Sequence, residues 1–164
     1  MRRFILNDKL KVIIEDNALN DMYKYQPERY SHENGGILLG KFNKEENTYI
    51  VSNVSTTNFE DKKGRSFFVR SKRKAQLIIN KFWKKSKGEI NYLGEWHTHN
   101  QLNPYPSDID KQLIKQMIDN KNIEIENVFM IILGKEKNLY ICTIDCKKEI
   151  QQLEEEWNAY IFCR

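Results

Sequence analysis

Apolar residues recur along the chain at two spacings, and the shorter spacing predicts strands. Short runs rich in β-branched and aromatic residues stand at 2–16, 35–42, 48–55, 66–70, 90–99, 128–134 and 138–145. We interpret the first run as one or two short strands. The pair 35–42 and 48–55, with a polar turn between them, predicts a hairpin. The unbroken apolar run at 128–134 is typical of a strand in the middle of a sheet.

Helical spacing of apolar residues marks four further segments. The first covers 17–23, with Asn17 as its predicted cap, and the second covers 71–88. A third begins at Ser107, and a closing helix is expected over 150–161. Strands interrupted by helices, some joined by hairpin-length turns, predict an α/β (α+β) fold with a mixed sheet and helices packed on it.

Composition narrows the class of protein. The chain has 164 residues, of which 40% are hydrophobic and 30% charged, and this length suits one domain over 1–164. No apolar run approaches the roughly eighteen residues of a membrane span, and the basic start precedes only a short apolar patch. We therefore expect a cytoplasmic protein without membrane association.

The cysteines and the net charge do not indicate a disulfide framework, a second metal site or nucleic-acid binding. Cys142, Cys146 and Cys163 lack the even number and spacing of a disulfide framework, and no second ligand pair accompanies them, so buried free thiols are the better interpretation. The net charge of +4 is mild, and the basic cluster 70–74 is interpreted mainly as a solvated face. Nucleic-acid binding would need a broader basic stripe and is not expected.

Candidate metal-binding and catalytic residues lie near the end of the strand predicted at 90–99. His97 and His99 lie two residues apart, so their side chains point to one side, about 7 Å apart at Cα, and can converge on one metal ion. Ser107 and Asp110 resemble a capping box, which would only start a helix, but an aspartate in the first turn also suits a third ligand. Two imidazoles and one carboxylate suit zinc and leave a fourth position for water. Glu33 could serve as the proton shuttle, although a surface-loop glutamate is the simpler interpretation.

These residues together resemble a known motif. His-Thr-His at 97–99, then seven residues, Ser107, two residues and Asp110, with Glu33 upstream of a Gly-Gly-Ile-Leu-Leu-Gly strand, resembles the motif of the JAMM (JAB/MPN) metalloproteases. The order of elements is similar to the MPN fold over most of the chain. The resemblance implies a mixed, largely antiparallel sheet flanked by helices, with a cytidine-deaminase-like architecture.

The same resemblance implies a role for each residue of the motif. It implies zinc binding by His97, His99 and Asp110, a general acid/base role for Glu33, and help from Ser107 in holding the oxyanion. Many relatives carry a proline after the second histidine, where this chain has Asn100. That departure concerns the loop and not a ligand.

The stretches GRSFFVRS and YLGEWHTH in so short a chain resemble those of small bacterial JAB proteins. These are encoded beside partners resembling ubiquitin-activating and ubiquitin-conjugating enzymes, often in antiphage operons. The resemblance implies cleavage after the C-terminus of a conjugated ubiquitin-like protein or, in the antiphage case, a nucleotidyltransferase.

Alternatives are a protease that processes a sulfur-carrier ubiquitin-like protein, a non-catalytic MPN interaction module and a DNA-repair-type JAB protein. A deaminase is poorly supported, because no Pro-Cys-x-x-Cys follows the histidines.

Binding of the substrate tail is expected beside residues 58–70. An extended tail that adds as a strand would satisfy its backbone amides there. An ordinary connecting loop is the alternative interpretation. Phe67 and Phe68 cannot both face the core of a regular strand, so one of them is expected to contact the tail.

Overall fold

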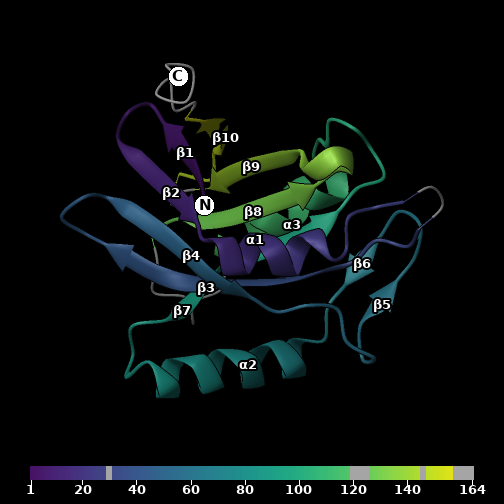
Figure 1. Ribbon diagram of the computed structural model, residues 1–164, viewed down its shortest axis with the longest axis horizontal. Coiled ribbons are helices and arrows are strands. Elements are labelled where there is room, and N and C mark those ends of the chain that lie inside the picture. Colours follow the sequence, from purple (N-terminus) through teal and green to yellow (C-terminus); the bar gives the residue numbers. More distant parts are fainter. Residues whose placement is uncertain (29–30, 119–125, 145–146, 157–164) are drawn as a thin grey trace, which may run out of the picture.

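Most strands of the protein belong to one large sheet. The computed structural model describes residues 1–28, 31–118, 126–144 and 147–156. In these ranges the nine-stranded sheet has the order β10-β9-β8-β7-β3-β4-β2-β1-β11 (Figure 1). Its strands are β1 (Arg2–Leu6), β2 (Leu10–Ile14), β3 (Gly35–Asn43), β4 (Thr48–Val54), β7 (Asn91–Thr98), β8 (Val128–Leu133), β9 (Leu139–Ile144), β10 (Ile150–Gln152) and β11 (Glu154–Glu155). Neighbours pair antiparallel except β2 with β4 and β7 with β8, which confirms the mixed, largely antiparallel sheet.

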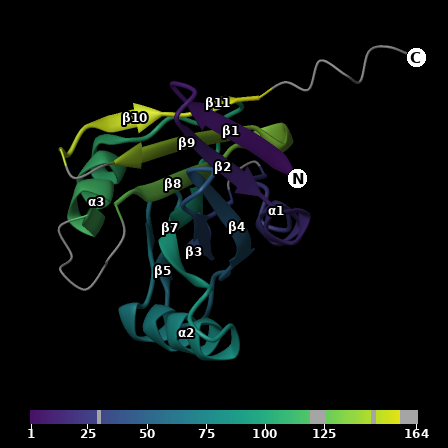
Figure 2. The ribbon, with the colours of Figure 1, turned by 90° about the vertical axis from the view of Figure 1, so that its left-hand side faces the viewer.

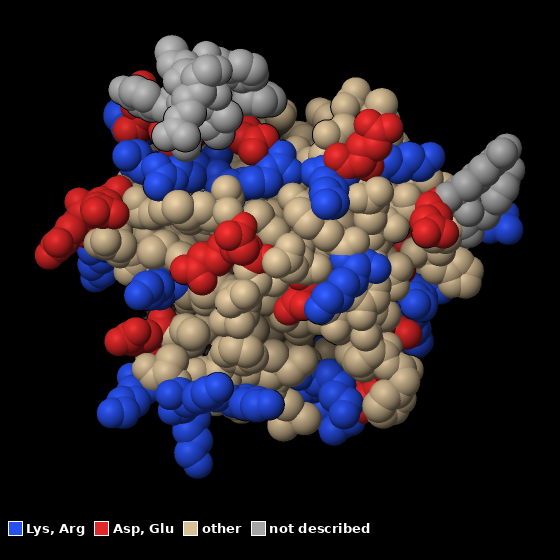
Figure 3. All heavy atoms as spheres, in the orientation of Figure 1, with Lys and Arg blue, Asp and Glu red and all other residues tan. Residues whose placement is uncertain are grey.

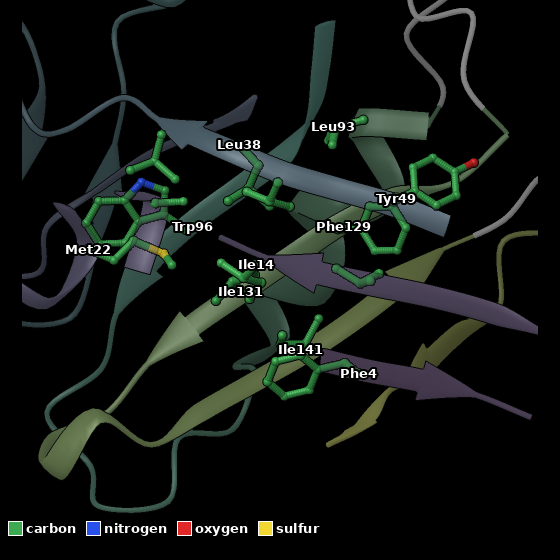
Figure 4. Packing of buried hydrophobic residues seen from close by; sticks show 14 of the residues in the cluster. Phe4, Ile14, Met22, Leu38, Tyr49, Leu93, Trp96, Phe129, Ile131 and Ile141 are labelled. Atoms are coloured by element: carbon green, nitrogen blue, oxygen red, sulfur yellow. The ribbon is translucent and has the colours of Figure 1, made fainter. Parts of the chain in front are cut away.

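Helices cover both faces of the sheet, which therefore carries two apolar clusters. One cluster packs against α1 (Asp16–Tyr23) and includes Trp96 and Phe129 (Figure 4). The other packs against α2 (Lys72–Lys85) and α3 (Asp108–Ile118). Residues of β8 alternate between the two clusters and all six are buried. This double burial explains the unbroken apolar run and confirms its central position.

The C-terminal part of the described chain closes the sheet. β10 pairs with β9 at one edge and β11 pairs with β1 at the other, although only Leu153 separates the two strands in sequence (Figure 2). The predicted closing helix is therefore wrong for residues 150–155, and the rest of it, 157–161, lies outside the described residues. Apolar spacing missed these strands because they have only three and two residues, too few for an alternating pattern to be recognised.

A small hairpin stands apart from the large sheet. β5 (Lys62–Lys63) pairs with β6 (Phe68–Val69) in a separate two-stranded sheet. The sequence predicted a strand only for its second half. A 3₁₀ turn, η1 (Lys135–Lys137), completes the described elements.

Of the predicted starts of α1 and α2, the structure confirms that of α2 and contradicts that of α1. Ser71 caps α2, its Oγ accepting a hydrogen bond from the Lys74 N–H at 3.2 Å. α1 instead begins after Glu15, which makes no side-chain capping bond, so Asn17 is not its cap. In the described ranges no helix is both long and apolar enough to cross a membrane.

Candidate metal centre

The two histidines and the aspartate meet at one point beside the sheet. His97 Nε2 lies 3.1 Å from His99 Nε2 and 3.2 Å from Asp110 Oδ1, and His99 Nε2 lies 3.4 Å from Asp110 Oδ2. All three residues are buried, and their potential ligand atoms lie within 4.8 Å of one another. In the described part of the chain no other group of three or more His, Cys, Asp or Glu side chains is arranged this way. The predicted ligand set is thus brought together and could hold a metal ion.

The elements around the site fix the orientation of each ligand. β7 lies between β3 and β8 and brings His97 to its end, and His99 follows directly. The Nδ1 atom of His99 lies 3.1 Å from the carbonyl oxygen of Tyr105, a contact in which Nδ1–H donates. That bond leaves the Nε2 lone pair of His99 directed at the site. Sequence reasoning missed Tyr105, because its contribution is a backbone carbonyl that any residue type could supply.

Asp110 is held as an anion by its neighbours. Burial by itself would raise the pKa of its carboxyl, but hydrogen bonds from His97, His99 and Ser107 outweigh burial and hold that pKa well below its usual range. For His99, burial opposes the charged ring, and the hydrogen bond and charge of Asp110, with a smaller effect of Glu33, raise its pKa. Asp110 is therefore ionised, and its carboxylate can serve as an anionic ligand for a cation.

Glu33 lies beside the ligands but outside ligand distance. Its Oε1 is 3.9 Å from His99 Nε2, and its side chain is 11% exposed. Burial raises the pKa of Glu33, and the neighbouring histidines offset part of this increase. A carboxylate with a raised pKa next to a metal site is suited to accept and return a proton. The neighbouring His32 is exposed and does not line the site.

Ser107 serves the start of α3. Its hydroxyl donates to Asp110 Oδ2 at 2.6 Å, its N–H donates to the same oxygen at 2.7 Å, and its Oγ accepts from the Asp110 N–H at 3.2 Å. This is the reciprocal capping arrangement that the sequence indicated. Ser107 is also exposed to the cleft.

A cleft of about 380 Å³ leads to the metal site. Its polar end holds Glu33, Ser107 and the three ligands, and its walls include Phe67, Phe68, Val69, Ile109 and Leu113. Phe67 is the outward phenylalanine, 47% exposed, whereas the ring of Phe68 lies directly over Gly35. The hairpin β5–β6 therefore forms one wall of the cleft.

Sequence reasoning missed a buried ion pair in the same cleft. Arg70 Nε donates to Glu95 Oε1 at 2.6 Å, and the hydroxyl of Tyr92 approaches the same oxygen at 3.4 Å. Position 95 could have been noticed, because it stands two residues before His97 and so shares its face of the strand.

The predicted solvated basic face at 70–74 is therefore correct only in part. Arg70 is paired with Glu95, and Arg73 and Lys74 both pair with Glu60. Blue side chains do gather along α2, at the bottom of Figure 3.

The one cysteine that the structure describes fits the expectation of a buried thiol. Cys142 is free and 1% exposed, and burial raises its pKa to about 12. Cys146 and Cys163 lie outside the described residues.

Comparison with known proteins agrees with this geometry. The family described as prokaryotic homologs of the JAB domain matches residues 15–145. An Escherichia coli protein named CD-NTase/cGAS isopeptidase is 30% identical over 146 residues, which cover 88% of each chain. A protein of the same name from Enterobacter hormaechei is 27% identical over 123 residues, covering 75% of this chain and 67% of the relative.

A solved structure supports the fold alone. The solution structure of a protein from Desulfitobacterium hafniense superposes with a TM-score of 0.59 at 18% identity, covering 88% of this chain and 89% of that one. The family match over most of the chain and the arrangement of the JAB motif residues lead to one conclusion: this chain belongs to the family of prokaryotic JAB-domain proteins.

Proposed function

We propose that the protein is a zinc-dependent isopeptidase of the JAMM type. It cleaves the bond that joins the C-terminus of one protein to an amine of another. The observation that carries this proposal is the meeting of His97, His99 and Asp110 within 3.1–3.4 Å, with the Glu33 carboxylate 3.9 Å from His99.

The donor set fits zinc. Ligand bonds of about 2.0–2.2 Å to a tetrahedral ion place two ligand atoms about 3.3–3.6 Å apart, close to the separations between these three side chains. Two imidazoles and a carboxylate are a usual ligand set of catalytic zinc and leave one position open. Bound there, zinc supplies Lewis acidity and a water of lowered pKa.

Two side chains of the protein perform the remaining catalytic steps. Glu33 takes the proton of the attacking water and returns it to the leaving amine, and its raised pKa suits both steps. The Ser107 hydroxyl, at the cleft end of α3, donates to the developing oxyanion, a type of contact that contributes about 2.7–4 kcal/mol in other hydrolases. The hydroxyl donates to Asp110 in this structure, so it has to rotate to do so.

The relatives indicate the class of substrate. Their names specify isopeptidases for CD-NTase or cGAS proteins, so we propose a CD-NTase-like nucleotidyltransferase, conjugated through its C-terminus to a lysine, as the substrate. Partners similar to ubiquitin-activating and ubiquitin-conjugating enzymes would form such a conjugate.

The test uses a purified conjugate of that kind and the metal-loaded protein. Wild type should release the intact nucleotidyltransferase, and Glu33→Gln should retain its metal yet lose cleavage by at least about 100-fold, the usual scale of acid–base catalysis. Cleavage by Glu33→Gln at the wild-type rate would overturn the proposed mechanism.

Metal binding has its own test. Wild type should hold about one zinc per chain, and His97→Ala, His99→Ala and Asp110→Ala should each lose it, measured by metal analysis after dialysis. His32→Ala is the matched control, because His32 is exposed and does not line the cleft. Full zinc content in all three ligand variants would refute the ligand assignment.

A further inference from the structure

The hairpin β5–β6 contacts three consecutive residues that begin with Glu33. The Gly64 carbonyl accepts a hydrogen bond from the Glu33 N–H at 2.7 Å. The Lys63 ammonium donates to Asn34 Oδ1 at 3.1 Å. The Phe68 ring covers Gly35 so closely that an added Cβ there would lie 2.7 Å from it.

The opposite side of this segment is held by the histidine strand. The Asn34 N–H donates to Thr98 Oγ1 at 3.0 Å, and the Thr98 N–H donates to the Asn34 carbonyl at 2.8 Å. Glu33 itself precedes β3, which begins at Gly35, so no sheet pairing fixes its backbone. Its N–H is bonded to the hairpin instead.

The hairpin depends on the sheet for its own position. Each of its strands has two residues, and an isolated two-stranded hairpin is marginally stable at best. Arg70 follows β6 directly and anchors it through the ion pair with Glu95. These side chains are 23% and 9% exposed, so the pair is shielded from bulk water.

We propose that the hairpin 62–69 is a positioning element for Glu33, with Phe68 and Lys63 as its positioning residues. This inference rests on the proposed function of Glu33. Displacing a reacting group by about 1 Å can lower a rate by about 100-fold, so a support of this kind bears directly on turnover. Both phenylalanines line the cleft: Phe68 packs over Gly35 beside Glu33, whereas Phe67, which packs on Gly64 and is 47% exposed, is the one that can meet the substrate.

Amide hydrogen exchange tests the positioning without any reaction. In Phe68→Ala, the Glu33 N–H should exchange at least about 10-fold faster than in wild type, because the Gly64 carbonyl is no longer held against it. Val69→Ala is the matched control, because Val69 follows Phe68 on β6 and is 56% exposed, and it should leave this amide protected. The Ile37 N–H, bonded to Ser55 Oγ inside β3, should be unchanged in both variants, which shows that the fold is intact. Unchanged protection of Glu33 in Phe68→Ala overturns the proposal.

Kinetics on the zinc-loaded protein provide the second readout. Phe68→Ala should lower kcat by about 10–100-fold with KM changed less than about 3-fold, whereas Phe67→Ala should mainly raise KM. Phe68→Leu, which still covers Gly35, should restore most of kcat. In a Glu33→Ala background, Phe68→Ala should lower the residual rate no further, since it acts through Glu33. An equal loss with and without Glu33 would overturn the proposal.

A variant at an exposed position covers the case in which Phe68→Ala folds poorly. Lys63→Met removes the donor to Asn34 at an exposed residue, and it should lower kcat by about 3-fold and increase exchange of the Glu33 amide. Lys63→Arg keeps a donor and should behave as wild type. If wild type fails to cleave the conjugate, the proposed function fails, whereas the exchange experiment still decides the positioning role.

Discussion

The Asp110 carboxylate belongs both to the candidate metal site and to the start of a helix. Its Oδ1 faces His97, whereas its Oδ2 accepts the N–H and the hydroxyl of Ser107 and also faces His99. Asp110 therefore stabilises the first turn of α3 whether or not a metal is bound. The capping interpretation of this residue is confirmed, and the geometry is compatible with the ligand role that we propose for it.

Replacement of Asp110 should lower stability even without metal. The loss of a capping partner typically costs about 0.5–2 kcal/mol, so chelator-treated Asp110→Ala should unfold at a lower urea concentration than chelator-treated wild type. Asp108→Ala is the matched control, because that carboxylate lies in the same turn but is 93% exposed and pairs with Lys111. Equal urea midpoints for the two variants would contradict the capping role.

Replacement of Glu33 should raise stability, whereas replacement of Asp110 lowers it. The size of the increase should depend on pH. Burial raises its pKa in the folded protein, so its stabilising contribution is complete below the unfolded pKa and is lost as pH rises through the folded pKa. In metal-free protein, Glu33→Gln should therefore melt at a higher temperature than wild type at pH 7. The difference should close towards about pH 4.5, where the unfolded glutamate also becomes neutral.

Thermal unfolding at several pH values measures this difference. Glu45→Gln is the matched control, because Glu45 is exposed in the turn between β3 and β4. A difference of the same size at every pH would show that burial of the Glu33 charge is not its cause.

Among the elements, β7 determines the direction in which the histidines point. The pairing with β3 shifts register between Leu38 and Leu39, opposite Gly94 and Tyr92. Because of this bulge, Tyr92 and Glu95 lie on the same side of the sheet, with the Tyr92 hydroxyl 3.4 Å from Glu95 Oε1, although they stand three positions apart in the strand. Gly94 adopts a φ of +145°, and a Cβ there would lie 1.9 Å from the Phe129 carbonyl oxygen.

Gly94→Ala should therefore damage both the fold and the site. Forcing a side chain into such a conformation costs on the order of 1–3 kcal/mol, and the clash with β8 adds to it. We expect a lower midpoint in denaturant and reduced zinc content. Gly88→Ala, after the end of α2, also has a positive φ of +93° but meets only the Trp83 ring at 3.3 Å, so it should cost less and leave zinc content unchanged. Equal zinc loss in both variants would contradict the role of the bulge.

Local patterns predicted most elements, and long-range pairing accounts for those they missed. The apolar run of β8 and the Ser71 cap of α2 act within a few residues, so the sequence revealed both. The ligand set was also predictable, because strand alternation and a helix cap fix the directions of its side chains. The bulge pairs Leu38 with Gly94, 56 positions apart, and the contact of Glu33 with Gly64 spans 31 positions, so no local spacing reports either of them.

At the scale of the whole molecule, the segment 150–155 holds the two edges of the sheet together. Leu153 is 3% exposed, and its N–H donates to the Ile141 carbonyl, so it fixes the point where the chain passes from one edge to the other. At the far edge, Arg2 forms two hydrogen bonds with Glu155, at 2.7 and 2.6 Å. The sheet therefore depends on a few residues for its closure.

Leu153→Ala should weaken this closure. Truncation of a buried leucine costs about 2–5 kcal/mol, and here it should also free the backbone edges of β1 and β9 for pairing with other chains. We expect a lower urea midpoint together with self-association in light scattering. Gln152→Ala, one residue earlier and exposed, should show neither effect. A destabilised Leu153→Ala that stays monomeric would show that the edges remain paired without the leucine.

The closed sheet also constrains the order of events during synthesis. β1 is made before β11, so its outer edge has no partner until β11 has been translated about 150 residues later. At about 5–20 residues per second, that edge waits for about 8–30 s on a growing chain. Arg2 and Arg3 lie on it, and charged side chains on an open edge discourage pairing with neighbouring chains. β1 thus gains its outer partner long after it is synthesised, and we expect its arginines to protect the nascent protein during that interval.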